Sequence, residues 1–360
     1  MNCILHIGTT KTGTTALQNF FYANQSQLSD QSVFLSDILG KPNNRLFTLY
    51  FQRFKKDRWA ATNNITNPKE KQAFFKDFEE RLSDDIKQAS IKHDTFIITS
   101  EGLSLRIKNS DEIAEIKNFL MQRFDQITIV GYFREQSDRA ISGHSQKMKG
   151  RGLKISLEKF LDKEATMQDY TYNYKAIADD WAAAFGKENC KFRIYDREYF
   201  PEKDIRLDFL NILGIPIDRS KLDFSITQKN QRLSRLQTAA FIKINTLVPY
   251  SHDPKSKTGS LNKKLKNAVL SLHSLNFGTN ITSKQTEVYR RFIELNTNFF
   301  KDYFDGEIGF KEPKKTTTEE KVFSLTEVEG LVSDIFEALL PLMAGTGDLK
   351  KPGMRRQSKD

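Results

Sequence analysis

Short apolar runs alternate with amphipathic segments along the first part of the chain, and this alternation narrows the folds that the chain can adopt. Runs at 1–7, 95–100, 127–133 and 191–195 are typical of buried strands. Between them, apolar residues recur at the three- and four-residue spacing of a helix. Strands joined through helices pair in parallel, because the helix carries the chain back to the starting edge of the sheet. The sequence therefore predicts an α/β fold with a central, mainly parallel sheet flanked by helices on both faces.

The predicted helices and the polar stretches divide the 360-residue chain into parts. Helices are expected at 14–28, about 70–90, 111–120, 174–185, 286–304 and 326–340. Polar, irregular insertions are expected at about 41–70 and 251–285. The predicted parts are an α/β domain at 1–305, a helical C-terminal extension at 306–345 and a basic, disordered tail at 346–360.

The composition offers little for a disulfide framework or a zinc cluster. The two cysteines, Cys3 and Cys190, are too few for either, and the five histidines are scattered without the spacing of a metal site. No uninterrupted apolar run approaches the ~20 residues that span a bilayer. The N-terminus also lacks the features of a secretion signal. These observations predict a cytoplasmic protein.

The chain carries an excess of positive charge. It has 56 Lys and Arg against 46 Asp and Glu, which gives a formal net charge of +10. This excess favours an anionic partner, whether a nucleotide, a nucleic acid, a sulfated glycan or a membrane surface. The basic residues of 346–360 are compatible with peripheral contact to a membrane. Charge alone does not choose among these partners.

The turn after the first predicted strand has the features of an anion-binding loop. Gly8 and Gly13 have the spacing of a phosphate-binding loop, and Lys11 lies between them. Backbone amides freed by such a turn, with the positive end of the following helix, bind a tetrahedral anion. The hydroxyl groups that can add donors are those of Thr12, Thr14 and Thr15. In nucleotide triphosphatases the Lys follows the second Gly directly, so this loop departs from their pattern at Thr14.

The third predicted strand is followed by a second set of candidate anion-binding residues. Arg134 lies at the strand end, and Ser142 lies eight residues further on a predicted helix. A guanidinium offers a rigid fork for phosphate, and a hydroxyl two turns into the helix reaches the same anion. Arg139 and Lys147 lie nearby and add to the positive charge.

The two segments together resemble the sulfotransferases that use 3′-phosphoadenosine 5′-phosphosulfate, in particular the bacterial-type members. Lys11-Thr-Gly-Thr-Thr15 after a buried strand is similar to the 5′-phosphosulfate loop of that family. Thr10 stands where the usual pattern has Pro, a variation found among bacterial-type members. Arg134 and Ser142 resemble the family's 3′-phosphate site. The resemblance covers roughly 1–305 and implies a three-layer sandwich of the P-loop type.

The resemblance implies transfer of a sulfuryl group from 3′-phosphoadenosine 5′-phosphosulfate to an acceptor hydroxyl. The acceptor expected from the family is a carbohydrate or glycoconjugate, and the product nucleotide is adenosine 3′,5′-bisphosphate. The residues assigned to donor binding are Thr10, Lys11, Thr12, Gly13, Thr14, Thr15, Arg134 and Ser142. Lys11 is the candidate that stabilises the charge growing on the departing 5′-phosphate, and this chemistry requires no metal. No specific nucleic acid partner is expected.

Transfer to a hydroxyl also requires a group that takes up its proton. Glu101 is our first candidate for this base, because it follows the second predicted strand at the edge where the anion sites lie. His144 is the alternative base, although its position beside Ser142 is more typical of a partly buried helix residue. His6 and Cys3 lie inside the first strand and are predicted to be core residues.

Two other functions remain open on the sequence. A small-molecule kinase of the P-loop class would bind ATP with magnesium, but it lacks the Lys expected at position 14. A non-catalytic binder of nucleic acids or other polyanions would use the net charge of +10 and would show a steep dependence on salt.

Overall fold

The computed structural model describes residues 1–226, 232–253, 255–272, 275, 283–306, 308–313, 330 and 333–335. The chain forms two compact units, which are described separately here. The first unit comprises Met1–Arg139, Ala165–Asn230 and Val288–Glu312. The second unit comprises Ala140–Glu164, Gln231–Glu287 and Pro313–Asp360. Residues of the predicted domain at 1–305 are thus divided between both units.

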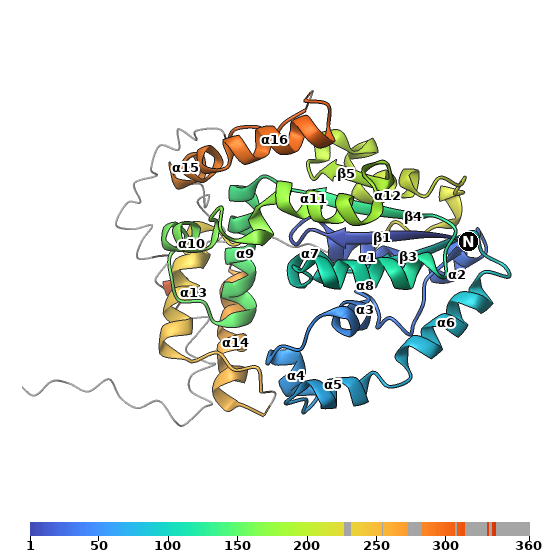
Figure 1. Ribbon diagram of the computed structural model, residues 1–360. Coiled ribbons are helices and arrows are strands. Elements are labelled where there is room, and N and C mark those ends of the chain that lie inside the picture. The colour runs from blue at the N-terminus through green and yellow to red at the C-terminus, as the bar shows by residue number, and fades with distance from the viewer. Residues whose placement is uncertain are drawn as a thin grey trace, which may run out of the picture. The chain divides into compact units, whose positions relative to one another are not determined.

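The elements follow one another in the order of Figure 1. The strands are β1 (Asn2–Gly8), β2 (Val33–Phe34), β3 (Thr95–Thr99), β4 (Ile127–Phe133) and β5 (Cys190–Ile194). The α-helices are α1 (Thr14–Ala23), α2 (Gln25–Ser29), α3 (Arg45–Phe51), α4 (Arg58–Thr62), α5 (Pro68–Phe74), α6 (Phe78–Ala89), α7 (Gly102–Arg106), α8 (Ser110–Met121), α9 (Gln136–Arg151), α10 (Leu157–Glu164), α11 (Tyr174–Phe185), α12 (Ile205–Ile212), α13 (Arg235–Leu247), α14 (Lys257–Ser271), α15 (Ser283–Arg291) and α16 (Ile293–Tyr303). The short 3-10 helices are η1 (Tyr170–Tyr172), η2 (Lys187–Asn189), η3 (Arg197–Tyr199), η4 (Pro201–Lys203) and η5 (Arg219–Lys221).

The strands of the described residues form one five-stranded sheet in the first unit, in the order β2-β3-β1-β4-β5. Every pairing in this sheet is parallel. The strand β1 lies in the middle, where His6 is paired with Thr99 of β3 and with Val130 of β4. The predicted parallel α/β fold is therefore confirmed. β2 has only two residues, which is too short to give a periodic signal in the sequence.

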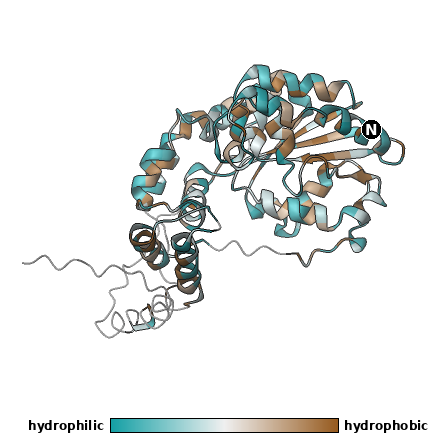
Figure 2. Ribbon diagram, turned by 90° about the horizontal axis from the view of Figure 1, so that it is seen from below, coloured by the Kyte–Doolittle hydropathy of each residue, from teal (hydrophilic) through white to brown (hydrophobic). Residues whose placement is uncertain are grey.

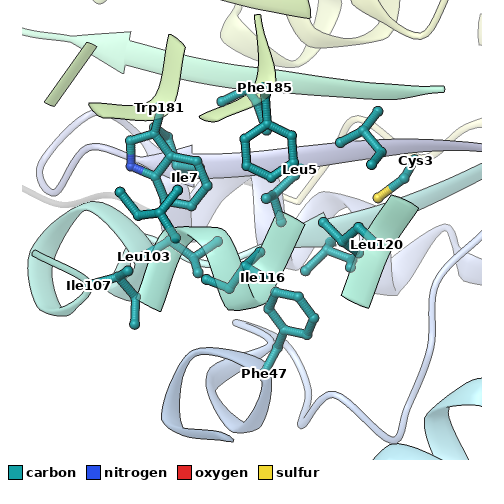
Figure 3. Close-up of a cluster of buried hydrophobic side chains, with 14 of the residues drawn as sticks. Cys3, Leu5, Ile7, Phe47, Leu103, Ile107, Ile116, Leu120, Trp181 and Phe185 are labelled. Carbon is teal, nitrogen blue, oxygen red and sulfur yellow. The ribbon is translucent and has the colours of Figure 1, made fainter. Parts of the chain in front are cut away.

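Helices cover both faces of this sheet. On one face, Ile4 of β1 packs in a cluster with residues of α1 and α12. On the other face, Cys3, Leu5 and Ile7 pack in a second cluster with residues of α8 and α11. Figure 3 shows this second cluster, in which Trp181 lies with side chains from β1 and α8. In Figure 2 the strands of the first unit are mostly coloured hydrophobic, as expected for a sheet buried on both faces.

His6 and Cys3 are core residues, as predicted. His6 is buried, and its Nδ1 lies 2.8 Å from the hydroxyl of Thr99. Burial lowers the pKa of His6 to about 3, so the ring is neutral at physiological pH. Burial likewise raises the pKa of the Cys3 thiol, which makes it a poor nucleophile.

The predicted insertion at 41–70 is more regular than its polarity suggests. It contains α3 and α4 and the start of α5. Asp57 caps α4 by accepting a hydrogen bond from the Ala60 amide. Asn67 caps α5 in the same way, by accepting a hydrogen bond from the Glu70 amide. Helices of five to seven residues are too short to show a helical period, and α4 and α5 are marked by local caps instead.

The predicted insertion at 251–285 also contains a helix, α14, in the second unit. Ser256 caps this helix by accepting a hydrogen bond from the Gly259 amide. Leu265 and Val269 of α14 pack with Phe241 of α13, which buries an apolar face beneath the lysines of the helix. The expectation of an irregular stretch is therefore wrong over this helix. The predicted tail at 346–360 lies outside the described residues, as does most of the helix predicted at 326–340.

Trp181 provides a test of the packing on the second face of the sheet. Replacing Trp181 with Ala is expected to lower the free energy of unfolding by about 3–5 kcal/mol, because the fully buried ring leaves a cavity. Trp181→Phe should cost clearly less, because Phe fills most of the space. The indole Nε1 also has no hydrogen-bond partner among the described residues. Urea unfolding measures both losses, and equal losses for the two variants would contradict this packing.

Candidate functional site

The turn between β1 and α1 leaves backbone donors at the start of a helix. Gly13 precedes α1 with a φ of 73°, and no side chain forms a capping hydrogen bond there. The first amides of a helix have no carbonyl partner within it, so they point outward at its positive end. A Cβ at Gly13 would lie 3.0 Å from the Tyr195 ring, so both the positive φ and the space favour glycine. This geometry is suited to an anion.

Internal hydrogen bonds hold the turn in place. The Thr9 amide and hydroxyl both donate to the Tyr132 carbonyl of β4, at 2.9 and 3.0 Å. The Thr12 hydroxyl donates to the Thr9 carbonyl at 2.6 Å. Thr12 is buried and its hydroxyl is engaged within the turn, so its role as a donor to an anion stays a prediction. Thr14 is buried as well, whereas Thr15 is exposed on the first turn of α1.

Two arginines from the end of β4 and the start of α9 contact this turn. Arg134 donates to the Lys11 carbonyl at 3.2 Å and pairs with Asp138 at 3.2 Å. Arg139 is buried and donates to the Thr10 hydroxyl at 3.0 Å. The turn after β1 and the turn after β4 are therefore in direct contact. In the sequence Arg139 was recognised only as nearby charge, and its direct contact with Thr10 was not predicted.

The guanidinium of Arg139 is held on both sides. It donates to the Thr171 carbonyl at 2.7 Å and lies 4.0 Å from the centre of the Tyr172 ring. A buried cation needs such partners, because its desolvation is costly. The segment η1 thereby fixes Arg139 against Thr10 of the turn.

Tyr195 is a site residue that the sequence did not reveal. It directly follows β5, and its ring packs against Gly13. The guanidinium of Arg134 lies 5.4 Å from the centre of the same ring. Its place after a strand of the parallel sheet was the available signal, but the predicted strand at 191–195 included it.

Glu101 lies against the start of the turn after β1. A Cβ added at Gly8 would be 3.0 Å from the Cα of Glu101. The Glu101 Oε2 accepts a hydrogen bond of 2.8 Å from the buried Gln18 side chain of α1. The described structure gives the Oε1 atom of Glu101 no hydrogen bond. The half-buried carboxylate is thus oriented by Gln18 at the edge where β1 and β3 end.

Ser142 and His144 belong to the second unit, in the part of α9 after Arg139. The structure therefore does not place Ser142 against Arg134, and their pairing remains a prediction. His144 is buried, with its Nε2 3.0 Å from the Ile155 carbonyl. Since a carbonyl only accepts, this nitrogen carries the proton. Burial lowers the pKa of His144, and its ring packs against Phe160, so its role as the alternative base stays a prediction.

Other features of the described residues lie apart from these turns. A groove of about 980 Å³ in the first unit is lined by residues of α3, α5 and α8, and none of the predicted site residues lines it. No group of three or more His, Cys, Asp or Glu side chains is arranged to hold a metal in the described ranges. Within the same ranges, no helix combines the length and hydropathy required to cross a membrane.

Known proteins resemble this chain at low sequence identity. No family model matches it. A protein of Archaeoglobus fulgidus, described as uncharacterized, is 28% identical over 259 residues, which cover 71% of this chain and 67% of that protein. The chain is also similar to the crystal structure of a sulfotransferase from Alicyclobacillus acidocaldarius, with a TM-score of 0.40 and 15% identity over 63% of this chain and 85% of that one.

Proposed function

We propose that this protein is a sulfotransferase that transfers the sulfuryl group of 3′-phosphoadenosine 5′-phosphosulfate to an acceptor hydroxyl. The observation that carries the proposal is the contact of Arg134 and Arg139 with the turn that holds Lys11. The same turn has the Lys-Thr-Gly-Thr-Thr sequence that resembles the 5′-phosphosulfate loop. Sequence and geometry therefore support one donor site.

The charges of this site suit a donor with several anionic groups. Lys11, Arg134 and the first amides of α1 lie around one turn. Charge-assisted hydrogen bonds from such groups are shorter and stronger than neutral ones. Asp138 also pairs with Arg134, which orients the guanidinium. In the proposal the turn after β1 binds the 5′-phosphosulfate, and Arg134 with Ser142 binds the 3′-phosphate.

The proposed reaction is an in-line displacement at sulfur. The acceptor oxygen forms a bond to sulfur while the bond from sulfur to the bridging oxygen of the 5′-phosphate breaks. The electron pair of the broken bond stays on adenosine 3′,5′-bisphosphate, where Lys11 and the turn amides stabilise the new charge. The acceptor proton passes to Glu101, whose Oε1 carries no hydrogen bond in the described structure. No step of this scheme requires a metal.

The proposed acceptor is a carbohydrate or glycoconjugate hydroxyl, an assignment that rests on the family resemblance. The natural first assay is transfer of ³⁵S from labelled 3′-phosphoadenosine 5′-phosphosulfate to a panel of saccharides. Label that appears in a saccharide supports the proposal. If no saccharide receives the label and the protein instead transfers phosphate from ATP, the kinase function would replace the sulfotransferase proposal.

Two substitutions separate donor binding from transfer. Lys11→Ala is expected to lower kcat by about 100-fold with a modest change in donor affinity, because its charge acts mainly on the leaving group. Arg134→Ala is expected to weaken donor binding by about tenfold or more, since it removes a charged hydrogen-bond partner. Lys92→Ala is the matched control, because exposed Lys92 precedes β3 at the opposite edge of the sheet. Equal effects of all three variants would reject the assignment.

Glu101→Gln tests the base. The substitution keeps an oxygen that accepts the hydrogen bond from Gln18, so folding and donor affinity should not change. Turnover on a hydroxyl acceptor is expected to fall by about 100-fold or more, because the amide cannot take up the proton. Steady-state kinetics with labelled donor measures this loss. Turnover close to that of the unmodified protein would end the role of Glu101 as a base.

A further inference from the structure

A second group of arginines lies beside Glu101, apart from the arginines of the donor site. Asn44 accepts a hydrogen bond of 2.7 Å from the Thr99 amide, at the C-terminal end of β3. One turn later in α3, Thr48 donates to the Ser100 hydroxyl at 3.0 Å. These contacts fix the start of α3 along the segment that leads into Glu101. Arg45 is the first residue of α3, so it lies at this edge of the sheet.

Two further arginines join Arg45 from neighbouring helices. Arg106 ends α7, the helix that directly follows Glu101, and it pairs with Asp57 at 2.5 Å. Asp57 caps α4, of which Arg58 is the first residue. We refer to Arg45, Arg58 and Arg106 as the arginine cluster. Arg58, Arg106 and Glu101 all lie within electrostatic range of Arg45.

Positive charge exceeds negative charge around the arginine cluster. Asp57 pairs with Arg106, and exposed Lys55 and Lys56 precede Asp57. Desolvation by the surrounding protein is the largest cause that lowers the pKa of Arg45, and the charges of Arg106 and Arg58 lower it further. The charges of Asp57 and Glu101 act in the opposite direction. This mutual influence indicates that the cluster and Glu101 share one electrostatic environment.

Arg45 is the member best placed to bind a ligand. It is exposed, and the described structure gives its guanidinium no hydrogen bond and no ion pair. Arg106, by contrast, is oriented by Asp57 and by the Gln52 side chain, whose Oε1 accepts a bond of 3.1 Å. A guanidinium group binds a planar anion such as a carboxylate through two parallel hydrogen bonds, and an oriented arginine next to an uncommitted one suits such a ligand.

We propose that the acceptor of this enzyme carries a carboxylate or a similar anion near the reactive hydroxyl, and that Arg45 and Arg106 bind it. This inference rests on the proposed function, because it takes Glu101 as the group that receives the acceptor proton. The anion on the arginine cluster would orient the sugar so that its hydroxyl lies at Glu101. A neutral sugar of the same shape lacks this contact and is a poorer acceptor.

Methyl glucuronide and methyl glucoside test the inference, because they differ only at C6, which is a carboxylate in the first and a hydroxymethyl group in the second. Each is offered as an acceptor with labelled donor, and each is titrated by calorimetry in the presence of adenosine 3′,5′-bisphosphate. We expect about tenfold higher kcat/KM and tighter binding for the glucuronide, since charged hydrogen bonds are roughly twice as strong as neutral ones. Equal use and equal binding of the two sugars would overturn the inference.

Arg45→Gln and Arg81→Gln form a matched pair of variants. Arg81 is exposed on α6, and the described structure gives its side chain no hydrogen bond or ion pair, so its removal changes the net charge equally. Arg45→Gln should abolish the preference for the glucuronide while the donor KM and the use of the glucoside stay unchanged. Arg81→Gln should retain the preference. If both variants weaken binding of the glucuronide equally, the net charge of the protein explains that binding and the inference fails.

The binding measurement separates this inference from the proposed function. Binding of the glucuronide that depends on Arg45, without sulfuryl transfer to either sugar, would refute the proposed function at this site and retain the anion site. Sulfuryl transfer to the neutral sugar alone would support the proposed function and refute the inference. Arg106→Lys adds a second test, because it keeps the positive charge and removes the planar guanidinium that binds a carboxylate through two hydrogen bonds. This variant should also reduce the preference for the glucuronide over the glucoside.

Discussion

All strands of the described sheet run in the same direction, and the candidate site depends on this constraint. Parallel strands end at one edge, so the segments that follow β1, β3, β4 and β5 meet there although they are distant in sequence. The turn with Lys11, the carboxylate of Glu101 and the guanidinium of Arg134 reach that edge in this way. Burial on both faces fixes the register of the strands and therefore the positions of these side chains.

Several residues both support the structure of the candidate site and contribute or orient its charges. Arg139 is buried and donates a hydrogen bond to Thr10, so it supports the turn and adds positive charge next to it. Gln18 orients Glu101 from α1, the helix whose first amides face the proposed donor. Tyr195 packs against Gly13, where a larger residue would not fit. Group transfer that is accelerated by proximity and orientation of the reacting groups requires such a rigid scaffold.

Much of the fold and part of the site could be predicted from the sequence. The four longer strands were predicted within a residue or two at each end, because buried parallel strands have continuous apolar runs. The turn after β1 and the placement of Glu101 at the same edge of the sheet followed from the alternation of strands and helices. The contacts of Arg139 and Tyr195 could not be predicted, since they depend on how turns from different strands meet. Thr12 shows the same limit, because only the folded turn shows that its hydroxyl bonds to Thr9.

The central claim is that the turn with Lys11 and the arginines after β4 form one site for a nucleotide with 3′- and 5′-anionic groups. Thermal unfolding with adenosine 3′,5′-bisphosphate, ATP, ADP and AMP, each with and without magnesium, tests it most directly. A ligand at 100 times its Kd stabilises the folded state by about 2.7 kcal/mol, which is a measurable rise in Tm. The account predicts a rise with the bisphosphate alone, independent of magnesium. A larger rise with ATP that requires magnesium, or no rise with any nucleotide, would contradict it.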